Sequence, residues 1–262
     1  MNGGLGRDMT VLDLEELAQI VAQQAYPLLF STVSGAHLYG FPSRDSDVDL
    51  RGAHVLPAEQ VVGLSHGPDT LDRSWVEHGA EVDVVTHDVA KFFRMLLRRN
   101  GYVLEQLLSP LVVSTTEEHE ELIALAQQCV TRHHAHHYLG FAQSQWDLFE
   151  RSGELKPLLY TFRALLTGIH LMRTGQVQAN LPELIDAVPE APTYLSLLIA
   201  AKATGEHSRL EPVDGGSRPL SAKDDVERLQ GLLEAARAES SLPDQPTGEP
   251  ALHSLLLRLR LG

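Results

Sequence analysis

The chain of 262 residues has one cysteine, few basic residues and no long apolar run. A single thiol, Cys129, cannot form an internal disulfide, so nothing points to an oxidising compartment. Only 21 Lys and Arg residues stand against 35 Asp and Glu residues. This balance argues against a broad electrostatic grip on nucleic acid but leaves a local basic groove open. No stretch reaches the roughly 18 apolar residues of a membrane span, and the N-terminus lacks a signal-peptide core. We therefore expect a cytoplasmic protein without membrane association.

Hydrophobic patterning separates a mixed first part from a helical remainder. Apolar spacing predicts a helix over 10–27 with Thr10 as its N-cap. The other segments expected in the first part are strands at 28–35, 47–57 and 79–87, a helix over 88–101 ended by Gly101, and a short helix over 102–109. Helical periodicity then covers 116–153, 156–175 and 193–205. Segments 205–221 and 239–250 are expected loops with a helix between them. We expect an α+β fold, with a small mixed-sheet domain at 1–115 and a helical domain at 116–262.

Two aspartates stand close together in the second expected strand. Asp47 and Asp49 are two residues apart, so they project from the same face, roughly 7 Å apart along the strand. Two such carboxylates repel each other, and a divalent cation removes that conflict. Asp83, in the next strand, is the natural third acid of a two-metal site for displacement at phosphorus. The turn at Gly35 would expose backbone N–H groups that can hold a triphosphate. Solvated strands also carry such acid pairs, so the pair alone leaves both interpretations open.

The spacing around these acids resembles a known signature. Gly35 and Ala36 are followed by Gly40 and then by Ser46-Asp47-Val48-Asp49-Leu50. This order resembles GS-x3-G-x5-SDxDL, the pattern of the DNA polymerase β-like nucleotidyltransferase superfamily. The continuation SDxDxRG, the N-x3-LE-x-L stretch at 100–107 and the K-x3-Y-x2-R pattern at 156–163 are similar to its RlaP or YcgL-like branch. The resemblance covers about residues 30–175.

The resemblance implies a polymerase β-like palm domain and a set of site residues. It places Mg²⁺ or Mn²⁺ on three acids, with Asp83 also serving as, or orienting, the base for the attacking hydroxyl. These catalytic and metal-binding residues are Asp47, Asp49 and Asp83. The implied nucleotide-binding residues are Gly35, Ala36, His37, Ser46, Arg51, Lys156, Tyr160 and Arg163. The implied reaction transfers a nucleoside monophosphate from an NTP to a hydroxyl acceptor, which is an RNA end, a small molecule or a protein.

Ala36 departs from the pattern, because the family has serine there. The missing hydroxyl removes one hydrogen bond to phosphate, worth about 1.5–3 kcal/mol, which would weaken NTP binding roughly ten- to a hundredfold. Two classes of function therefore stay open. The three acids favour an enzyme, and Ala36 favours a non-catalytic nucleotide-binding or partner-binding module.

Several other residues have both a functional and a structural interpretation. Arg51 can hold a phosphate or pair with Asp49. His37 can donate to phosphate or pack against Tyr39. The helix face of Lys156, Tyr160 and Arg163 can close over a triphosphate or remain solvated.

Further polar residues favour the structural interpretation. These are Glu105, within a short helix, and Arg94, Arg98 and Arg99, at a helix end. His133 and His137 have a spacing that can bind zinc, but no cysteine or acid nearby completes a ligand set. We expect them on a polar helix face.

Overall fold

The computed structural model describes residues 12–77, 80–205, 208–209 and 222–262. The chain divides into two compact units. Unit 1 takes segments 1–38, 46–131 and 245–262, and unit 2 takes 39–45 and 132–244. The division differs from the expected boundary at 115/116, since the helical residues 117–126 and the C-terminal segment both pack in unit 1.

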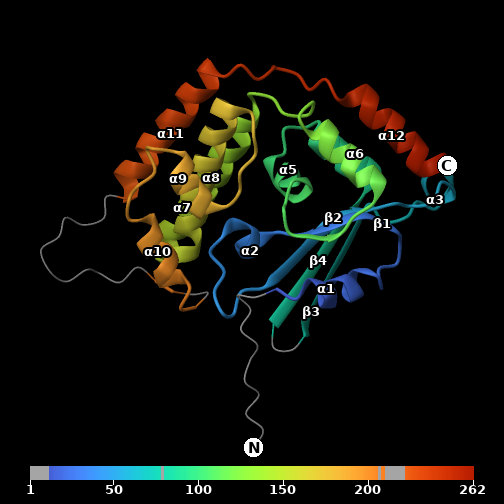
Figure 1. Ribbon diagram of the computed structural model, residues 1–262, viewed down its shortest axis with the longest axis horizontal. Helices are drawn as coiled ribbons and strands as arrows, with labels where there is room; N and C mark the ends of the chain where they lie inside the picture. The colour runs from blue at the N-terminus through green and yellow to red at the C-terminus, as the bar shows by residue number, and fades with distance from the viewer. Residues whose placement is uncertain (1–11, 78–79, 206–207, 210–221) are drawn as a thin grey trace, which may run out of the picture. The chain divides into compact units, whose positions relative to one another are not determined.

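Unit 1 is built on a mixed sheet whose order, in the described part of the chain, is β3-β4-β2-β1-β5 (Figure 1). The strands are β1 (Leu28–Val33), β2 (Val48–His54), β3 (Thr70–Glu77), β4 (Ala80–Asp88) and β5 (Val112–Ser114). β2 and β4 are parallel, and the other neighbours are antiparallel. The three expected strands correspond to β1, β2 and β4, and the predicted α+β fold is confirmed.

Helices cover the sheet of unit 1 on both faces. They are α1 (Leu14–Val21), α2 (Gly35–Tyr39), α3 (Glu59–Val62), α4 (Val89–Leu96), α5 (Gly101–Leu107), α6 (Glu117–Ala126) and α12 (Glu249–Leu261); the last residue of α2, Tyr39, already belongs to unit 2. Leu17 and Val21 of α1 join the apolar side chains of β1, β2 and β4 in one buried cluster. Phe30 of β1 packs on Phe92 of α4 and stacks on His119 of α6. Burial of these apolar faces is the main stabilising force of the unit.

Two helix ends differ from the sequence expectation. The carboxylate of Asp13 accepts the backbone N–H groups of residues 15 and 16 and so caps α1, whereas the expected N-cap, Thr10, lies outside the described residues. The prediction that the helix of 88–101 runs to Gly101 was wrong, because α4 ends at Leu96. Arg99 adopts φ of 63°, which interrupts the helix, and Asn100 then caps α5 with Gly101 as its first residue.

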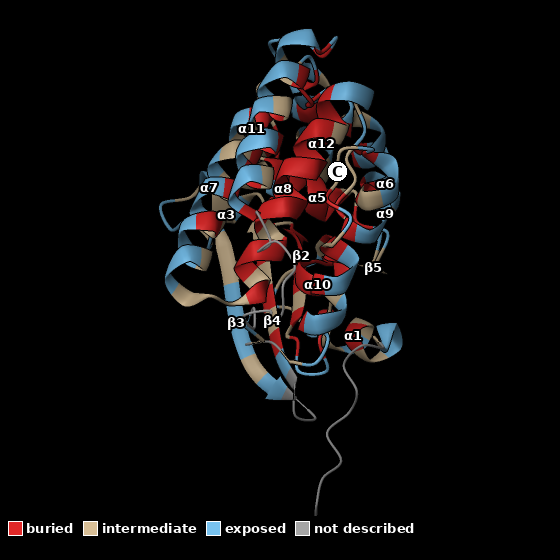
Figure 2. Ribbon diagram, turned by 90° about the vertical axis from the view of Figure 1, so that its left-hand side faces the viewer, coloured by how far each residue is buried: buried red, intermediate tan, exposed pale blue. Residues whose placement is uncertain are grey.

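Unit 2 is helical in its described residues. Its helices are α7 (His134–Ser152), α8 (Leu155–Thr174), α9 (Leu181–Ala187), α10 (Leu195–Lys202) and α11 (Ala222–Glu239). The core helix α8 is buried along most of its length (Figure 2). The expected helix over 116–153 is two helices, α6 and α7. Most of the expected loop at 205–221 lies outside the described residues.

The C-terminal helix α12 completes unit 1. Its Arg260 donates to the Leu56 carbonyl and to the Asp88 carboxylate, and the side chains of this ion pair are 7% and 4% exposed. Asp88 also caps α4 by accepting from Ala90 N. The buried pair therefore ties the last helix to the end of β4. Among the described residues, every helix is too short or too polar to cross a bilayer.

Candidate active site

The parallel pairing of β2 and β4 brings two of the predicted acids together. In the register of the two strands, Asp49 lies directly opposite Asp83. The prediction that Asp83 lies on the strand next to that of Asp49 is therefore confirmed. The side chains are 26% and 28% exposed, so each carboxylate is partly desolvated and partly open to water. Neighbouring carboxylates of this kind repel each other unless a cation lies between them.

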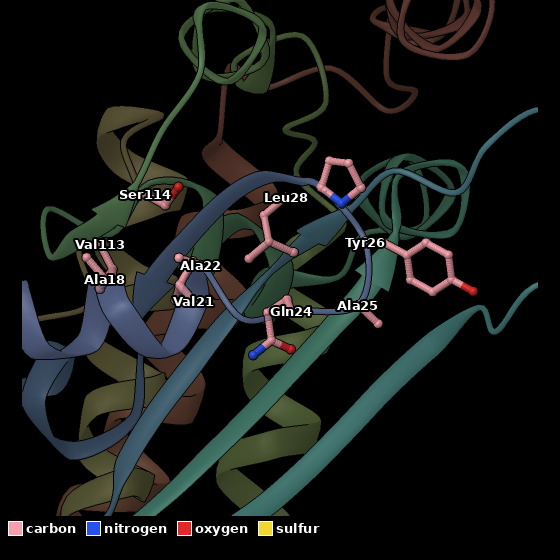
Figure 3. Close-up of a pocket in the computed structure, with 10 residues that line it drawn as sticks. Ala18, Val21, Ala22, Gln24, Ala25, Tyr26, Leu28, Val113 and Ser114 are labelled. Atoms are coloured by element: carbon pink, nitrogen blue, oxygen red, sulfur yellow. The ribbon is translucent and has the colours of Figure 1, made fainter.

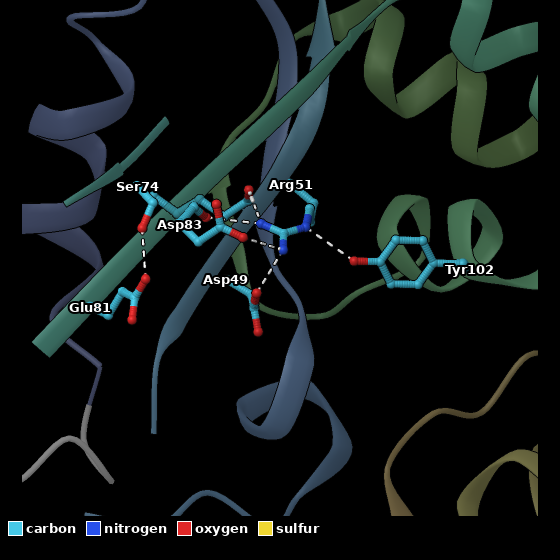
Figure 4. Close-up of polar contacts among 7 residues, drawn as sticks. Asp49, Arg51, Ser74, Glu81, Asp83 and Tyr102 are labelled. Atoms are coloured by element: carbon cyan, nitrogen blue, oxygen red, sulfur yellow. Dashed lines mark hydrogen bonds and ion pairs between the residues drawn. The ribbon is translucent and has the colours of Figure 1, made fainter. Parts of the chain in front are cut away.

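The cation between them is Arg51, which is two residues beyond Asp49 in β2 and therefore on the same face (Figure 4). Its Nη2 donates to Asp49 Oδ1 at 2.6 Å and to Asp83 Oδ2 at 2.7 Å. The Nη1 atom donates to the backbone oxygens of Leu50 and Asp83 at 3.0 and 2.9 Å. The Nε atom donates to Tyr102 Oη at 3.1 Å. All five N–H groups of the guanidinium are thus engaged. Of the two sequence interpretations, the structure shows the pairing with Asp49, and a phosphate contact of Arg51 stays a prediction.

Burial and the partners of Arg51 act in opposite directions on its pKa. Desolvation lowers the pKa, but the charges of Tyr102, Asp49 and Asp83 outweigh it, and the net pKa is raised. These partners therefore favour the charged form of the guanidinium. Tyr102 was not singled out from the sequence, because a tyrosine in a short amphipathic helix carries no signal of its partner.

Asp47 is the third of the predicted acids. It precedes the first residue of β2 and is half-buried. Within the described ranges, no three His, Cys, Asp or Glu side chains are grouped as an ion would require. The structure therefore brings Asp49 and Asp83 together, but Asp47 does not complete a cluster of three. The donor chemistry of the pair still fits a divalent cation, because carboxylate oxygens are the ligands that Mg²⁺ prefers and the pair already holds one cation.

The glycine turn lies against the Asp49 carboxylate. Gly35 has φ of +62°, and a Cβ atom there would lie 1.9 Å from Asp49 Oδ2. The backbone N–H of Ser34 donates to the Asp49 carbonyl at 2.8 Å, which fixes the turn to β2. Ala36 and His37, which follow Gly35, and Ser46, which precedes β2, are buried as well. The turn thus needs glycine both for its backbone conformation and for the close approach of the acid.

Gly35→Ala should disturb the acid pair as well as the turn. The left-handed conformation and the clash with Asp49 together should cost about 1–3 kcal/mol of unfolding free energy. Urea unfolding measures this loss. Gly231→Ala, at a helical position with no atom within 4 Å of the added methyl group, is the control and should be neutral or stabilising. Equal stability of the two variants would show that the turn can relax away from Asp49.

The segment 39–45, between the turn and the acid strand, belongs to unit 2. Gly40 has φ of +81°, and a Cβ there would come within 2.6–2.8 Å of Asn180 and Pro182. Ser43 accepts a hydrogen bond from the fully buried Lys202 at 3.0 Å. The second glycine of the motif is therefore required by packing on α9.

The three predicted residues of α8 meet the same segment. The Arg163 guanidinium lies 3.8 Å from the centre of the Tyr39 ring and is 2% exposed. Tyr160 packs edge-on against Tyr39 and Phe41. Lys156 and Tyr160 are half-buried. The face is not a solvated one, because its arginine is buried on an aromatic ring.

The remaining polar candidates have structural surroundings. His133 pairs with Asp244 at 3.2 Å and stacks on His136. His137 stacks on Phe141. Glu105 is 2% exposed within α5. Arg94, in the last turn of α4, and Arg98 and Arg99, in the segment after it, are exposed.

A groove of about 470 Å³ lies at the other side of the sheet, between α1, the start of β1 and β5 (Figure 3). Small and apolar side chains such as Ala18, Val21 and Leu28 line it. Of its lining residues in the described part of the chain, none belongs to the predicted site. The acid pair, on β2 and β4, is a separate feature.

Residues 9–258 match the model of a family described as "RlaP: RNA repair pathway DNA polymerase beta family". The chain belongs to the RlaP family. The match spans both units, so the helical part is as much a feature of the family as the sheet. The resemblance inferred from the glycine turn and the acid strand is thereby confirmed, and with it membership of a polymerase β-like nucleotidyltransferase family.

Two curated proteins are similar over most of their length. The uncharacterized protein MJ0002 of Methanocaldococcus jannaschii is 29% identical over 241 residues, which cover 89% of this chain and 94% of the relative. The uncharacterized protein YcgL of Bacillus subtilis is 24% identical and covers 76% and 78% of the two chains. A nucleotidyltransferase-like protein from Exiguobacterium sibiricum 255-15 has a solved structure with 13% identity and a TM-score of 0.31, covering 95% of this chain and 78% of that chain.

Proposed function

We propose that this RlaP-family protein transfers a nucleoside monophosphate from an NTP to a hydroxyl acceptor and releases pyrophosphate. The observation that carries the proposal is the pair of facing carboxylates on two parallel strands, with a glycine turn packed against one of them. This arrangement suits a phosphoryl group held at the turn while its reacting phosphorus faces the acids.

Each residue of the proposed site has a role. Asp49 and Asp83 would hold Mg²⁺ or Mn²⁺, with Asp47 as a further ligand. The bound ion supplies activation of the attacking hydroxyl and stabilises the charge on phosphate. Asp83 accepts or orients the hydroxyl proton. The turn residues and Ser46 hold phosphate oxygens.

The residues of α8 take part in the proposal as well. Lys156 and Tyr160 would contact the nucleotide, since their side chains are half-buried and not enclosed. Arg163 would act from its stacked position by supporting Tyr39 and Tyr160. The acceptor is an RNA end, a small molecule or a protein, and the description of the family makes an RNA end the first to test.

A binding module without turnover is the second candidate. Ala36 lacks the hydroxyl of the family serine, and Arg51 engages both acids with all of its donors accounted for. Both observations favour a chain that keeps the fold and holds a nucleotide or partner without reaction.

The decisive experiment uses each of the four NTPs with an α-phosphate label, with Mg²⁺ or Mn²⁺, and with or without RNA. Labelling of the protein or RNA, or release of pyrophosphate, supports the enzyme. In parallel, an NTP with a divalent ion should raise the melting temperature above the NTP alone, because a ligand at a hundred times its dissociation constant adds about 2.7 kcal/mol. Binding without turnover for every NTP would favour the second candidate, and no metal-dependent shift would contradict the metal role.

Ala36→Ser should tighten NTP binding. The restored hydroxyl can donate to a phosphate oxygen, which predicts a roughly ten- to a hundredfold lower KM with little change in kcat. Steady-state kinetics measure both constants, and Ala53→Ser, a buried alanine farther along β2, is the control. An unchanged KM would mean that the Ala36 side chain does not face the phosphates.

A further inference from the structure

Arg51 occupies the position at which a divalent cation would meet the two acids. One nitrogen, Nη2, bonds both Asp49 Oδ1 and Asp83 Oδ2, and the other donors fix the guanidinium to two backbone oxygens and to Tyr102. The side chain is only 11% exposed. A group with every donor satisfied and little exposure is held in one place.

We propose that Arg51 is a resident cation of the acid pair, which a divalent ion must displace from the carboxylates before it can bind there. This inference rests on the proposed metal role of Asp49 and Asp83. It assigns to Arg51 a positioning role that sets when metal binds, with a phosphate contact open to it only after it has left the two acids.

The charge balance of the pair supports displacement. Two carboxylates with one guanidinium carry a net charge of −1, and adding a divalent ion between the same oxygens would place three positive charges against two negative ones. Charges of equal sign a few ångströms apart near a protein surface repel each other strongly. The oxygens facing Arg51 therefore serve either the guanidinium or the ion.

Displacement explains how the protein can be stable without metal and still respond to its substrate. Without an ion, Arg51 removes the repulsion between Asp49 and Asp83. When an NTP arrives, its negatively charged phosphates offset the added positive charge and offer the released guanidinium a partner. Divalent ions should therefore bind weakly to the free protein and more tightly with NTP, a positive coupling between the two ligands.

Direct Mn²⁺ titration tests the proposal without any need for turnover. The electron paramagnetic resonance signal of free Mn²⁺ gives the dissociation constant of the wild type, Arg51→Gln and Arg51→Lys. A neighbouring arginine typically changes the pKa of a carboxyl group by about 1–3 units, and Mn²⁺ must overcome an interaction of this size to replace Arg51. Removing Arg51 should therefore tighten Mn²⁺ binding by about ten- to a thousandfold. Arg73→Gln removes the same charge from an exposed position on β3 and should match the wild type. Arg51→Lys keeps the charge but has three donors instead of five, so it cannot keep all the bonds that hold Arg51 in place, and should fall between.

The outcomes separate this inference from the proposed function. Arg51→Gln that binds Mn²⁺ no more tightly than the wild type would overturn the resident-cation role while leaving the metal site intact. No Mn²⁺ binding by any of the proteins, with or without NTP, would overturn the metal role as well. If Arg51→Gln does not fold, the ¹⁵N resonance of the Arg51 Nε–H group in the wild type takes its place. It should shift when Mg²⁺ and NTP are added together, and an unchanged resonance at saturating ligand would refute displacement.

Discussion

Asp49→Asn should lower the rate of nucleotidyl transfer by about two to four orders of magnitude while the fold survives. The amide keeps an oxygen that can accept from Arg51 Nη2 but removes the negative charge that a divalent ion requires. Loss of several kcal/mol of charge stabilisation at the reacting phosphate corresponds to this range, because each 1.36 kcal/mol is tenfold in rate. Single-turnover assays with an α-labelled NTP measure the rate, and circular dichroism checks the fold.

Asp72→Asn is the matched control for this variant. Asp72 lies on β3, is exposed, and pairs in register with Val85 of β4. Its substitution therefore removes the same charge close to the acid pair. Its rate should stay within about twofold of the wild type, as expected for a solvated surface charge. If Asp49→Asn keeps its rate, Asp49 has no part in the chemistry and the metal assignment fails with it.

Arg260→Gln should lower the unfolding free energy of unit 1 by about 3–5 kcal/mol. Removing one partner of a buried ion pair leaves an uncompensated charge, here the carboxylate of Asp88, which is 4% exposed. The same carboxylate caps α4, so its rearrangement would also weaken that helix. Urea unfolding followed by tryptophan fluorescence measures the change, with Trp75 reporting on unit 1 and Trp146 on unit 2.

Arg258→Gln, on the same helix, supplies the comparison. Arg258 pairs with Glu121, and both side chains are about half exposed. Exposed pairs contribute roughly 0–1 kcal/mol, so this variant should unfold almost as the wild type does. If Arg258→Gln and Arg260→Gln lose similar unfolding free energy, the other contacts of α12, and not the buried pair, hold the helix in place.

The sequence predicted the parts of the sheet that carry the acids because two independent signals agreed there. The alternation of apolar side chains placed β2 and β4, the motif spacing singled out Asp49, and the family resemblance added Asp83 as the third acid on the next strand. β3 was not predicted, because most of its residues from Thr70 to Val76 are exposed and show no apolar period. β5 has only three residues, too few for any periodicity to be read.

The surroundings of the acids could be predicted only in part. The pairing of Arg51 with Asp49 was one of two interpretations of the sequence. It could be predicted because residues i and i+2 of a strand share a face. The other contacts of Arg51, with Asp83 and with Tyr102, depend on the strand order and on the position of α5. Strand order is set by long-range packing, which a single sequence does not display.

The unit boundary shows the same limit. Residues 117–126 have helical periodicity like the residues after them, so composition offered no reason to assign α6 to the sheet. What assigns it is contact: His119 stacks on Phe30 of β1, with ring centres 4.5 Å apart, and Thr116 donates to the Leu29 carbonyl at 3.0 Å. Cytoplasmic location and the identity of the acceptor stay predictions.

The return of α12 to unit 1 has a consequence for how the protein folds during synthesis. A ribosome releases the chain from the N-terminus, and domains generally fold as units as soon as their residues emerge. Unit 2 ends at residue 244, whereas unit 1 needs segment 245–262. The helical unit is therefore complete before the sheet that precedes it. Until the last turn of α12 leaves the exit tunnel, Asp88 lacks its partner Arg260, and unit 1 lacks the helix that this buried ion pair attaches to the end of β4.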